Sequence, residues 1–99
     1  MTTSGVPTRL KKAEWKQIFS YPWQPMYRLV LEEIHRQKNK PVPMKKLREV
    51  APGFMYGQRG SMNGMFFGKK LPFFLQNANP SSRNACLHAK LYIARRSDE

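Results

Sequence analysis

The segment FMYGQRGSMNGMFFGKKLPFFLQ, residues 54–76, contains five of the six phenylalanines and four of the six glycines of this chain. It also contains three basic residues and no acidic residue. Aromatic side chains are usually buried in a small domain, whereas basic side chains without acidic neighbours stay in water and attract anionic molecules. We therefore expect this segment to form part of the core and to carry a cationic rim that meets an anionic polymer.

Glycines divide the first part of this segment. Gly60, Gly64 and Gly68 are four residues apart, so they would form one bare stripe on a helix. Each glycine destabilises a helix by about 1 kcal/mol relative to alanine. We therefore predict a loop or an irregular helical turn over residues 57–64.

The apolar residues that follow this part recur at helical spacing. They are Leu71, Phe74, Leu75 and Ala78. Proline is tolerated in the first turn of a helix, so Pro72 is compatible with this pattern. The spacing predicts a basic helix over residues 68–77. A buried strand over residues 71–76 is the competing interpretation, since a short apolar run fits either element.

Upstream, apolar spacing and proline positions predict three helices. Thr8 is a suitable N-cap for a helix over residues 9–19. Pro25 suits the first position of a helix over residues 25–38, in which four apolar residues form one face. Pro43 begins a further helix, which ends before the Pro-Gly pair at residues 52–53.

The C-terminal part alternates in polarity. Residues 77–84 are rich in Asn, Pro and Ser, which predicts a loop. In the sequence that follows, Leu87, Ala89, Leu91 and Ile93 alternate with Cys86, His88, Lys90 and Tyr92. This alternation predicts a half-buried strand that exposes the second set. Residues 1–7 and 95–99 are expected to be tails.

Length and composition indicate one basic domain. The chain has 99 residues, and we place the domain at residues 8–94. The net charge is +12, with no acidic residue from Ala51 to Ser97, which favours nucleic acid, acidic membranes or acidic proteins as partners. Apolar runs are far too short for a membrane span, and we expect no membrane partner. The single cysteine, Cys86, fits a reducing intracellular compartment, the cytoplasm first and the nucleus or mitochondrion as alternatives.

The expected order of elements is a helix, an extended Val42, a second helix, a basic third helix, a loop and a strand. This order resembles that of winged-helix domains. The run from Phe67 to Leu75, FGKKLPFFL, followed by Pro80, is similar to the FG-x-x-KL-x-x-FL-x(n)-P pattern of LOTUS (OST-HTH) and Egalitarian-type winged helices. The resemblance covers residues 24–94. It implies a mainly α, α+β domain that binds RNA or a protein partner without catalysis, through the basic third helix.

Basic, amide and aromatic side chains form the predicted nucleic-acid site, with RNA favoured over DNA. Lysine and arginine contact phosphate, an amide reaches base edges, and an exposed ring stacks on a base. The predicted site residues are Lys45, Lys46, Arg59, Lys69, Lys70, Phe73, Gln76, Arg83, His88, Lys90, Tyr92 and Arg95. For two of them a structural role is the alternative: Phe73 also fits the core, and Arg59 also fits an ordinary surface loop.

Two other functions are kept as alternatives. The Met/Phe-rich segment would dock a protein partner if Phe54, Met55 and Met62 formed an exposed patch. The chain would otherwise be a small structural subunit of a ribonucleoprotein, whose basic loops become ordered on assembly.

The sequence does not predict an enzyme, a cofactor or a metal site. Glu32 and Glu33 are adjacent, so they diverge on a helix and cannot form a facing acid–base pair. Cys86 and His88 supply two metal ligands on one strand face, whereas a zinc site needs more.

Overall fold

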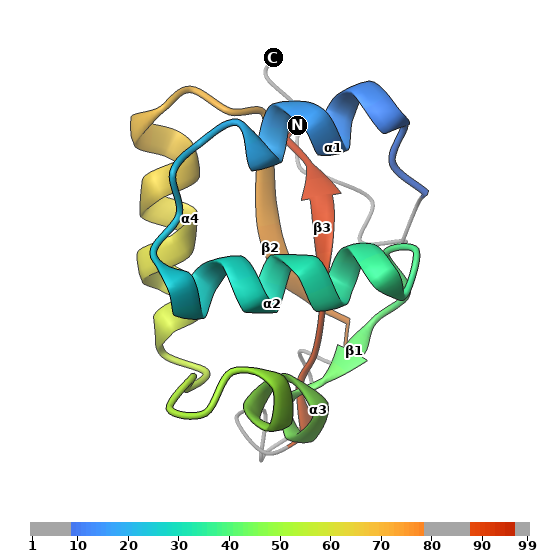
Figure 1. The fold of residues 1–99 in the computed structure, drawn as a ribbon, viewed down its shortest axis with the longest axis vertical. Coiled ribbons are helices and arrows are strands. Elements are labelled where there is room, and N and C mark those ends of the chain that lie inside the picture. Colours follow the sequence, from blue (N-terminus) through green and yellow to red (C-terminus); the bar gives the residue numbers. More distant parts are fainter. Residues whose placement is uncertain (1–8, 79–87, 97–99) are drawn as a thin grey trace.

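A computed structural model describes residues 9–78 and 88–96 of the chain (Figure 1). Four helices and three strands follow one another in these residues. They are α1 (Lys12–Phe19), α2 (Pro25–Arg36), β1 (Val42–Pro43), α3 (Met44–Val50), α4 (Gln58–Gly68), β2 (Phe73–Asn77) and β3 (Lys90–Arg95). The chain is therefore an α+β domain, as the sequence predicts.

The three strands form an antiparallel sheet in the order β1-β3-β2. Val42 pairs with Leu91 on one side of the central strand, and Leu75 pairs with Ile93 on the other. A helix, a strand, two helices and two strands in this order make a winged-helix-like fold, to which α1 adds a further helix. In Figure 1, α2 crosses in front of the sheet, with α1 above it, α3 below it and α4 at the left.

The face of α2 that its apolar spacing predicts lies in the core. Val30, Leu31 and Ile34 are fully buried. Burial of such a side chain contributes about 1.5–3 kcal/mol, which explains why this helix forms where the sequence predicts it. The helix ends at Arg36 instead of residue 38, because Lys38 takes a left-handed backbone conformation with a φ of 58°.

The helix α1 covers one end of the core. It begins at Lys12 instead of residue 9, and it buries Trp15 and Ile18. The indole of Trp23 donates a hydrogen bond of 2.9 Å to the main-chain oxygen of Ile18, and its ring lies 4.9 Å from that of Phe66. These aromatic contacts attach α1 to α4.

Of the two interpretations of residues 57–64, the loop is wrong and the helical turn is closer, because residues 58–64 belong to the helix α4. Met62 and Phe66 lie one turn apart on this helix and are both fully buried. Their burial contributes about 1.5–3 kcal/mol each, which offsets the cost of about 1 kcal/mol for each glycine in the helix. The glycines face outward, where a Cβ added at Gly60 or Gly64 would meet no atom within 4 Å.

The basic helix predicted over residues 68–77 is also wrong, and the competing strand interpretation is confirmed. The helix α4 ends at Gly68, Lys70 turns the chain with a φ of 57°, and β2 follows. Alternate residues of β2 are buried, beginning with Phe73 and Leu75. The spacing of the apolar residues is compatible with a helix, but pairing with β3 selects the strand. The spacing could not show this, because β3 lies well beyond β2 in the chain.

The strand β3 is more buried than its alternating pattern predicts. All residues from Leu91 to Ala94 are buried, because β3 is the central strand of the sheet. The tail predicted from residue 95 begins later: Arg95 ends the strand, and the main-chain N–H of Arg96 donates to the oxygen of Pro72 at 2.7 Å. Residues 86 and 87 of the predicted strand lie outside the described residues.

Two asparagine side chains occupy open edges of the sheet. Asn39, only 1% exposed, donates to the carbonyl of Ile93 and accepts from its N–H, both at 2.8 Å. On the other edge, Asn63 of α4 makes the same two bonds with Leu75, at 3.1 and 2.7 Å. Leu75 and Ile93 form a non-hydrogen-bonded pair across β2 and β3, and each asparagine satisfies the outward-facing N–H and carbonyl of one member of that pair. The two asparagines attach α4 and the turn after α2 to the strands.

Candidate nucleic-acid interface

The acidic side chains of the described residues are all engaged within the chain. They are Glu14, Glu32, Glu33 and Glu49, and each forms an ion pair with an arginine or a lysine. The same part of the chain includes seventeen of the eighteen lysines and arginines. The chain's own carboxylates therefore leave most of this positive charge uncompensated, which favours an anionic partner.

The structure divides the predicted site residues between the two ends of β3. Lys45, Lys46, His88 and Lys90 are at the end nearest α3, since Lys90 pairs with Pro43, which directly precedes that helix. We call this group the α3 end. Lys45, His88 and Lys90 are exposed, and Lys46 lies 3.9 Å from a carboxylate oxygen of Glu49.

Lys69, Lys70 and Arg95 are at the opposite end of β3. Arg95 pairs with Phe73, the first residue of β2, and both lysines belong to the turn that leads into that strand. We call this group the α1 end. A strand of this length spans about 20 Å, so the predicted residues form two separate basic groups and not one binding face.

Two predicted ring contacts are wrong. Phe73 is 1% exposed and Tyr92 is fully buried, so neither ring can stack on a base. The alternative stated for Phe73, a place in the core, is confirmed. Tyr92 is buried because it lies in the central strand. Its partner across the sheet, Gln76, is half-buried, and its role in reading base edges stays a prediction.

Arg59 has a structural role that neither sequence interpretation foresaw. It belongs to α4 and not to a loop, and its Nη1 donates a hydrogen bond of 3.3 Å to the main-chain oxygen of Leu75. Its guanidinium also lies 5.1 Å from the ring centroid of Tyr56. The side chain is thus half-buried against the sheet, and its role as a phosphate ligand stays a prediction. Arg83 lies outside the described residues and stays a prediction.

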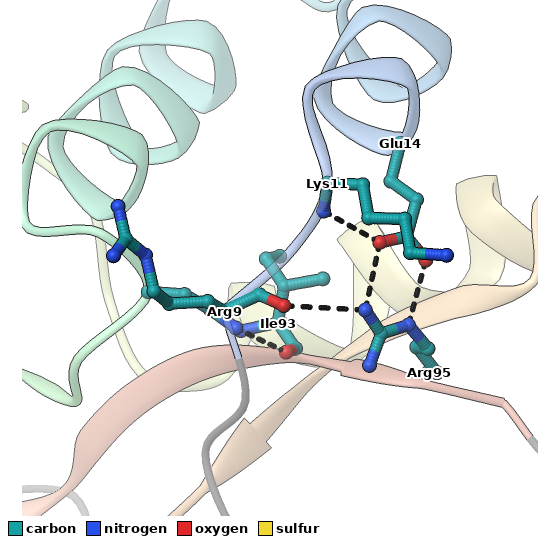
Figure 2. A network of polar contacts seen from close by, with 6 residues as sticks. Arg9, Lys11, Glu14, Ile93 and Arg95 are labelled. Atoms are coloured by element: carbon teal, nitrogen blue, oxygen red, sulfur yellow. Dashed lines mark hydrogen bonds and ion pairs between the residues drawn. The ribbon is translucent and has the colours of Figure 1, made fainter.

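Arg95 is engaged by α1 (Figure 2). Its Nε and Nη2 donate to the two carboxylate oxygens of Glu14 at 2.6 and 2.8 Å, and Nη2 also donates to the main-chain oxygen of Arg9 at 3.2 Å. The main-chain N–H of Lys11 donates to the same carboxylate at 2.7 Å. Arg95 therefore ties the start of α1 to the end of β3, and its role as a phosphate contact stays a prediction.

This ion pair predicts an acid-sensitive contribution to stability. The hydrogen bond from Arg95 lowers the pKa of Glu14, and partial burial opposes the effect. A folded-state pKa below the unfolded value of about 4.3 stabilises the fold above that pH, and the stabilisation is lost as the pH falls through the folded pKa. We expect Glu14→Gln to reduce the free energy of unfolding at pH 7 by about 0.5–1 kcal/mol, as for other exposed pairs. Urea unfolding followed by circular dichroism should show this difference shrinking below about pH 4. A difference that stays constant down to pH 3 would contradict the assignment.

Phe67 is a feature of the α1 end that the sequence analysis missed. It is 48% exposed, because its neighbour Phe66 occupies the buried face of α4. The guanidinium of Arg96 lies 4.6 Å from its ring centroid, and Nζ of Lys69 lies 5.5 Å from the ring centroid of Tyr21. We call Tyr21, Phe67, Lys69, Lys70 and Arg96 the turn surface. The adjacent phenylalanines were a usable signal, since two neighbours on a helix cannot both face the core.

Lys70 stands in this surface at an energetic cost. The main-chain N–H of Lys70 donates to the oxygen of Phe67 at 3.0 Å, and that of Leu71 donates to the oxygen of Phe66 at 2.9 Å. This is the Schellman arrangement at the end of a helix, in which glycine is the usual left-handed residue. The left-handed conformation costs other residues about 1–2 kcal/mol. The fold therefore holds a lysine, and not the usual glycine, at this left-handed position.

The Met/Phe patch expected for a protein partner does not form as predicted. Phe54 and Met62 are fully buried, whereas Met55 is 59% exposed. In residues 9–78 and 88–96, no cluster of three metal-ligating side chains occurs, and every helix is too short or too polar to cross a membrane. Comparisons of the chain with protein-family models, curated proteins and solved structures found no match.

Proposed function

We propose that this protein is a non-catalytic nucleic-acid-binding domain that favours RNA over DNA and binds it on the turn surface. One observation carries the proposal: the exposed ring of Phe67 is followed by Lys69 and Lys70 and has the guanidinium of Arg96 over it. Aromatic rings set among cations are a recurring arrangement in proteins that bind single-stranded nucleic acid.

The chemistry of the turn surface suits an unpaired nucleotide. A base stacked on an aromatic side chain contributes about 1–3 kcal/mol, whatever its sequence. Lys69 and Lys70 are both exposed and could contact the phosphates on either side of that base. RNA is favoured because its loops and single strands present unstacked bases that can be splayed onto a ring.

Three further observations support this proposal. The winged-helix-like order of elements agrees with the resemblance of residues 67–75 to LOTUS and Egalitarian-type domains. The α3 end adds exposed cations that a longer strand would reach. The single cysteine fits an intracellular, cytoplasmic location, which we include in the proposal.

A titration of labelled single-stranded RNA, hairpin RNA and duplex DNA at several salt concentrations tests the proposal. We expect the affinity to rank in that order, and the logarithm of the affinity to fall with the logarithm of salt by about 0.7 for each phosphate contact on a single strand. Equal, weak binding to all three would overturn the proposal and favour a protein partner, for which exposed Met55 and Leu29 are the candidates.

The variant Phe67→Ala separates stacking from charge in the same titration. It should weaken single-stranded RNA binding by about 1–3 kcal/mol and leave the salt dependence unchanged, because no cation is removed. Duplex DNA serves as the internal control, since its paired bases are not available to the ring. An equal loss on single-stranded RNA and duplex DNA would argue against stacking on Phe67.

A further inference from the structure

A cleft of about 410 Å³ lies between α1 and the C-terminal end of α2. Its lining includes Arg9, Lys12, Trp15, His35, Arg36 and Lys38, and no lining residue is acidic. Four cations around one cleft repel one another, so an anion between them would stabilise the arrangement. The volume is in the range of about 300–1,000 Å³ that is usual for small-ligand sites.

Two arginines of the cleft are positioned by neighbouring groups. Arg36 forms an ion pair with Glu33, whose side chain is 2% exposed and also accepts a hydrogen bond of 2.8 Å from Gln37, while the arginine itself is 65% exposed. The main-chain oxygen of Arg9 is held by Arg95 at 3.2 Å, and Figure 2 shows the Arg9 side chain directed away from the Glu14–Arg95 pair. The guanidinium of Arg9 thus lies apart from that ion pair.

His35 supplies a flat ring beside these cations. Its side chain is exposed, and the ring of the buried Trp15 lies against it with centroids 4.6 Å apart. Phe19 contacts the same imidazole from 5.7 Å. Two supporting rings hold the imidazole in one orientation, which suits it to stack on a nucleobase whose phosphate meets the cations.

Two lysines of the cleft occupy positions that are unfavourable in the absence of an anion. Lys12 is the first residue of α1, where the helix dipole disfavours positive charge. Lys38 follows α2 in the left-handed position of a Schellman arrangement, with a φ of 58°. Attraction to the C-terminal dipole of α2 offsets only part of what the left-handed backbone costs at Lys38.

We propose that this cleft binds a phosphorylated nucleoside, with the phosphate on Arg9, Lys12, Arg36 and Lys38 and the base stacked on His35. The proposal goes beyond RNA binding on the turn surface and does not depend on it. A free nucleotide and the phosphorylated end of an RNA strand offer the same chemistry to the cleft.

Titration of the whole chain with adenosine 5′-monophosphate, followed by NMR, tests the site. We expect the nucleotide to shift the indole N–H signal of Trp15 and the ring signals of His35, with the indole signal of Trp23 as internal reference. Adenosine and inorganic phosphate should each bind at least about tenfold more weakly, because each supplies one half of the recognised group. Absence of a Trp15 shift at millimolar nucleotide would overturn the proposal.

The variant Lys38→Gly tests the location without risk to folding. It removes one cation and relieves a left-handed lysine, so the free energy of unfolding should stay equal or rise. Nucleotide affinity should fall by about tenfold with the loss of one charged hydrogen bond. Lys40→Gly is the control, which removes an exposed lysine two residues farther along the chain and outside the lining of the cleft, and it should leave nucleotide affinity nearly unchanged. Equal losses in both variants would mean general charge attraction and would overturn the site.

Two RNA oligonucleotides of one sequence, with a 5′-phosphate or a 5′-hydroxyl, identify the source of the ligand. Tighter binding of the phosphorylated strand that disappears in Lys38→Gly would place a strand end in the cleft. Equal binding of both strands, together with nucleotide binding, would indicate a free nucleotide. If RNA does not bind but the nucleotide shifts Trp15, the proposed function fails and the cleft stands.

Discussion

Reversing the charge of Lys69 and Lys70 to glutamate is expected to weaken binding of single-stranded RNA on the order of a hundredfold near 0.1 M salt. Two phosphate contacts are lost, and two carboxylates then repel the backbone, which together corresponds to about 2.7 kcal/mol. The salt dependence should become shallower by about 1.4, which is 0.7 for each lost contact. Fluorescence anisotropy with labelled RNA at four or more salt concentrations measures both quantities.

The matched control for this experiment is the double variant Lys45→Glu and Lys90→Glu. It makes the same change in net charge, on two exposed lysines at the α3 end. We expect it to weaken binding much less, because those residues lie about 20 Å from the turn surface, beyond the Debye length of about 10 Å at 0.1 M salt. Equal losses of RNA affinity in the two double variants would show that the lysines act only through the overall positive charge. The turn surface would then not be the binding site.

Replacing Asn39 with alanine is expected to reduce the free energy of unfolding by about 2–4 kcal/mol. The change leaves the N–H and the carbonyl of Ile93 without the two 2.8 Å partners that now satisfy them in a buried place. It also puts alanine at a φ of 64°, which asparagine tolerates better. Urea unfolding followed by circular dichroism measures the loss.

Asn63→Ala is the comparison on the opposite edge of the sheet. It removes the same pair of hydrogen bonds from Leu75, whose oxygen still accepts from Arg59 at 3.3 Å. Asn63 is also half-buried, so water can satisfy the freed groups in part. We expect a loss of about 1–2 kcal/mol. Losses below 1 kcal/mol in both variants would show that the asparagine hydrogen bonds at the two edges of the sheet contribute little to stability.

The elements that the sequence predicted correctly are those whose pattern is local. The spacing of Val30, Leu31 and Ile34 after Pro25 defines one apolar face, and α2 buries that face. The pattern from Pro43 predicts α3 in the same way. The α+β class also follows from the sequence, since helical spacing and strand alternation occur in different segments.

Elements that form only against partners distant in the chain could not be predicted from the local pattern of apolar residues. The glycines of residues 57–68 argue against a helix, and α4 forms only because Met62 and Phe66 have a core to enter. The run from Leu71 to Gln76 fits a helix or a strand equally well. Its pairing with β3, and the attachment of Leu75 to Asn63, select the strand.

For the candidate site, too, some features follow from the sequence alone and others depend on the tertiary structure. Composition alone determined the excess of positive charge and the basic residues at positions 69 and 70, because charge does not depend on folding. Tertiary structure decided which side chains are accessible: it buried Phe73, engaged Arg95 with Glu14 and exposed Phe67. Whether a phenylalanine faces water or core depends on what packs against its element, and that partner comes from elsewhere in the chain.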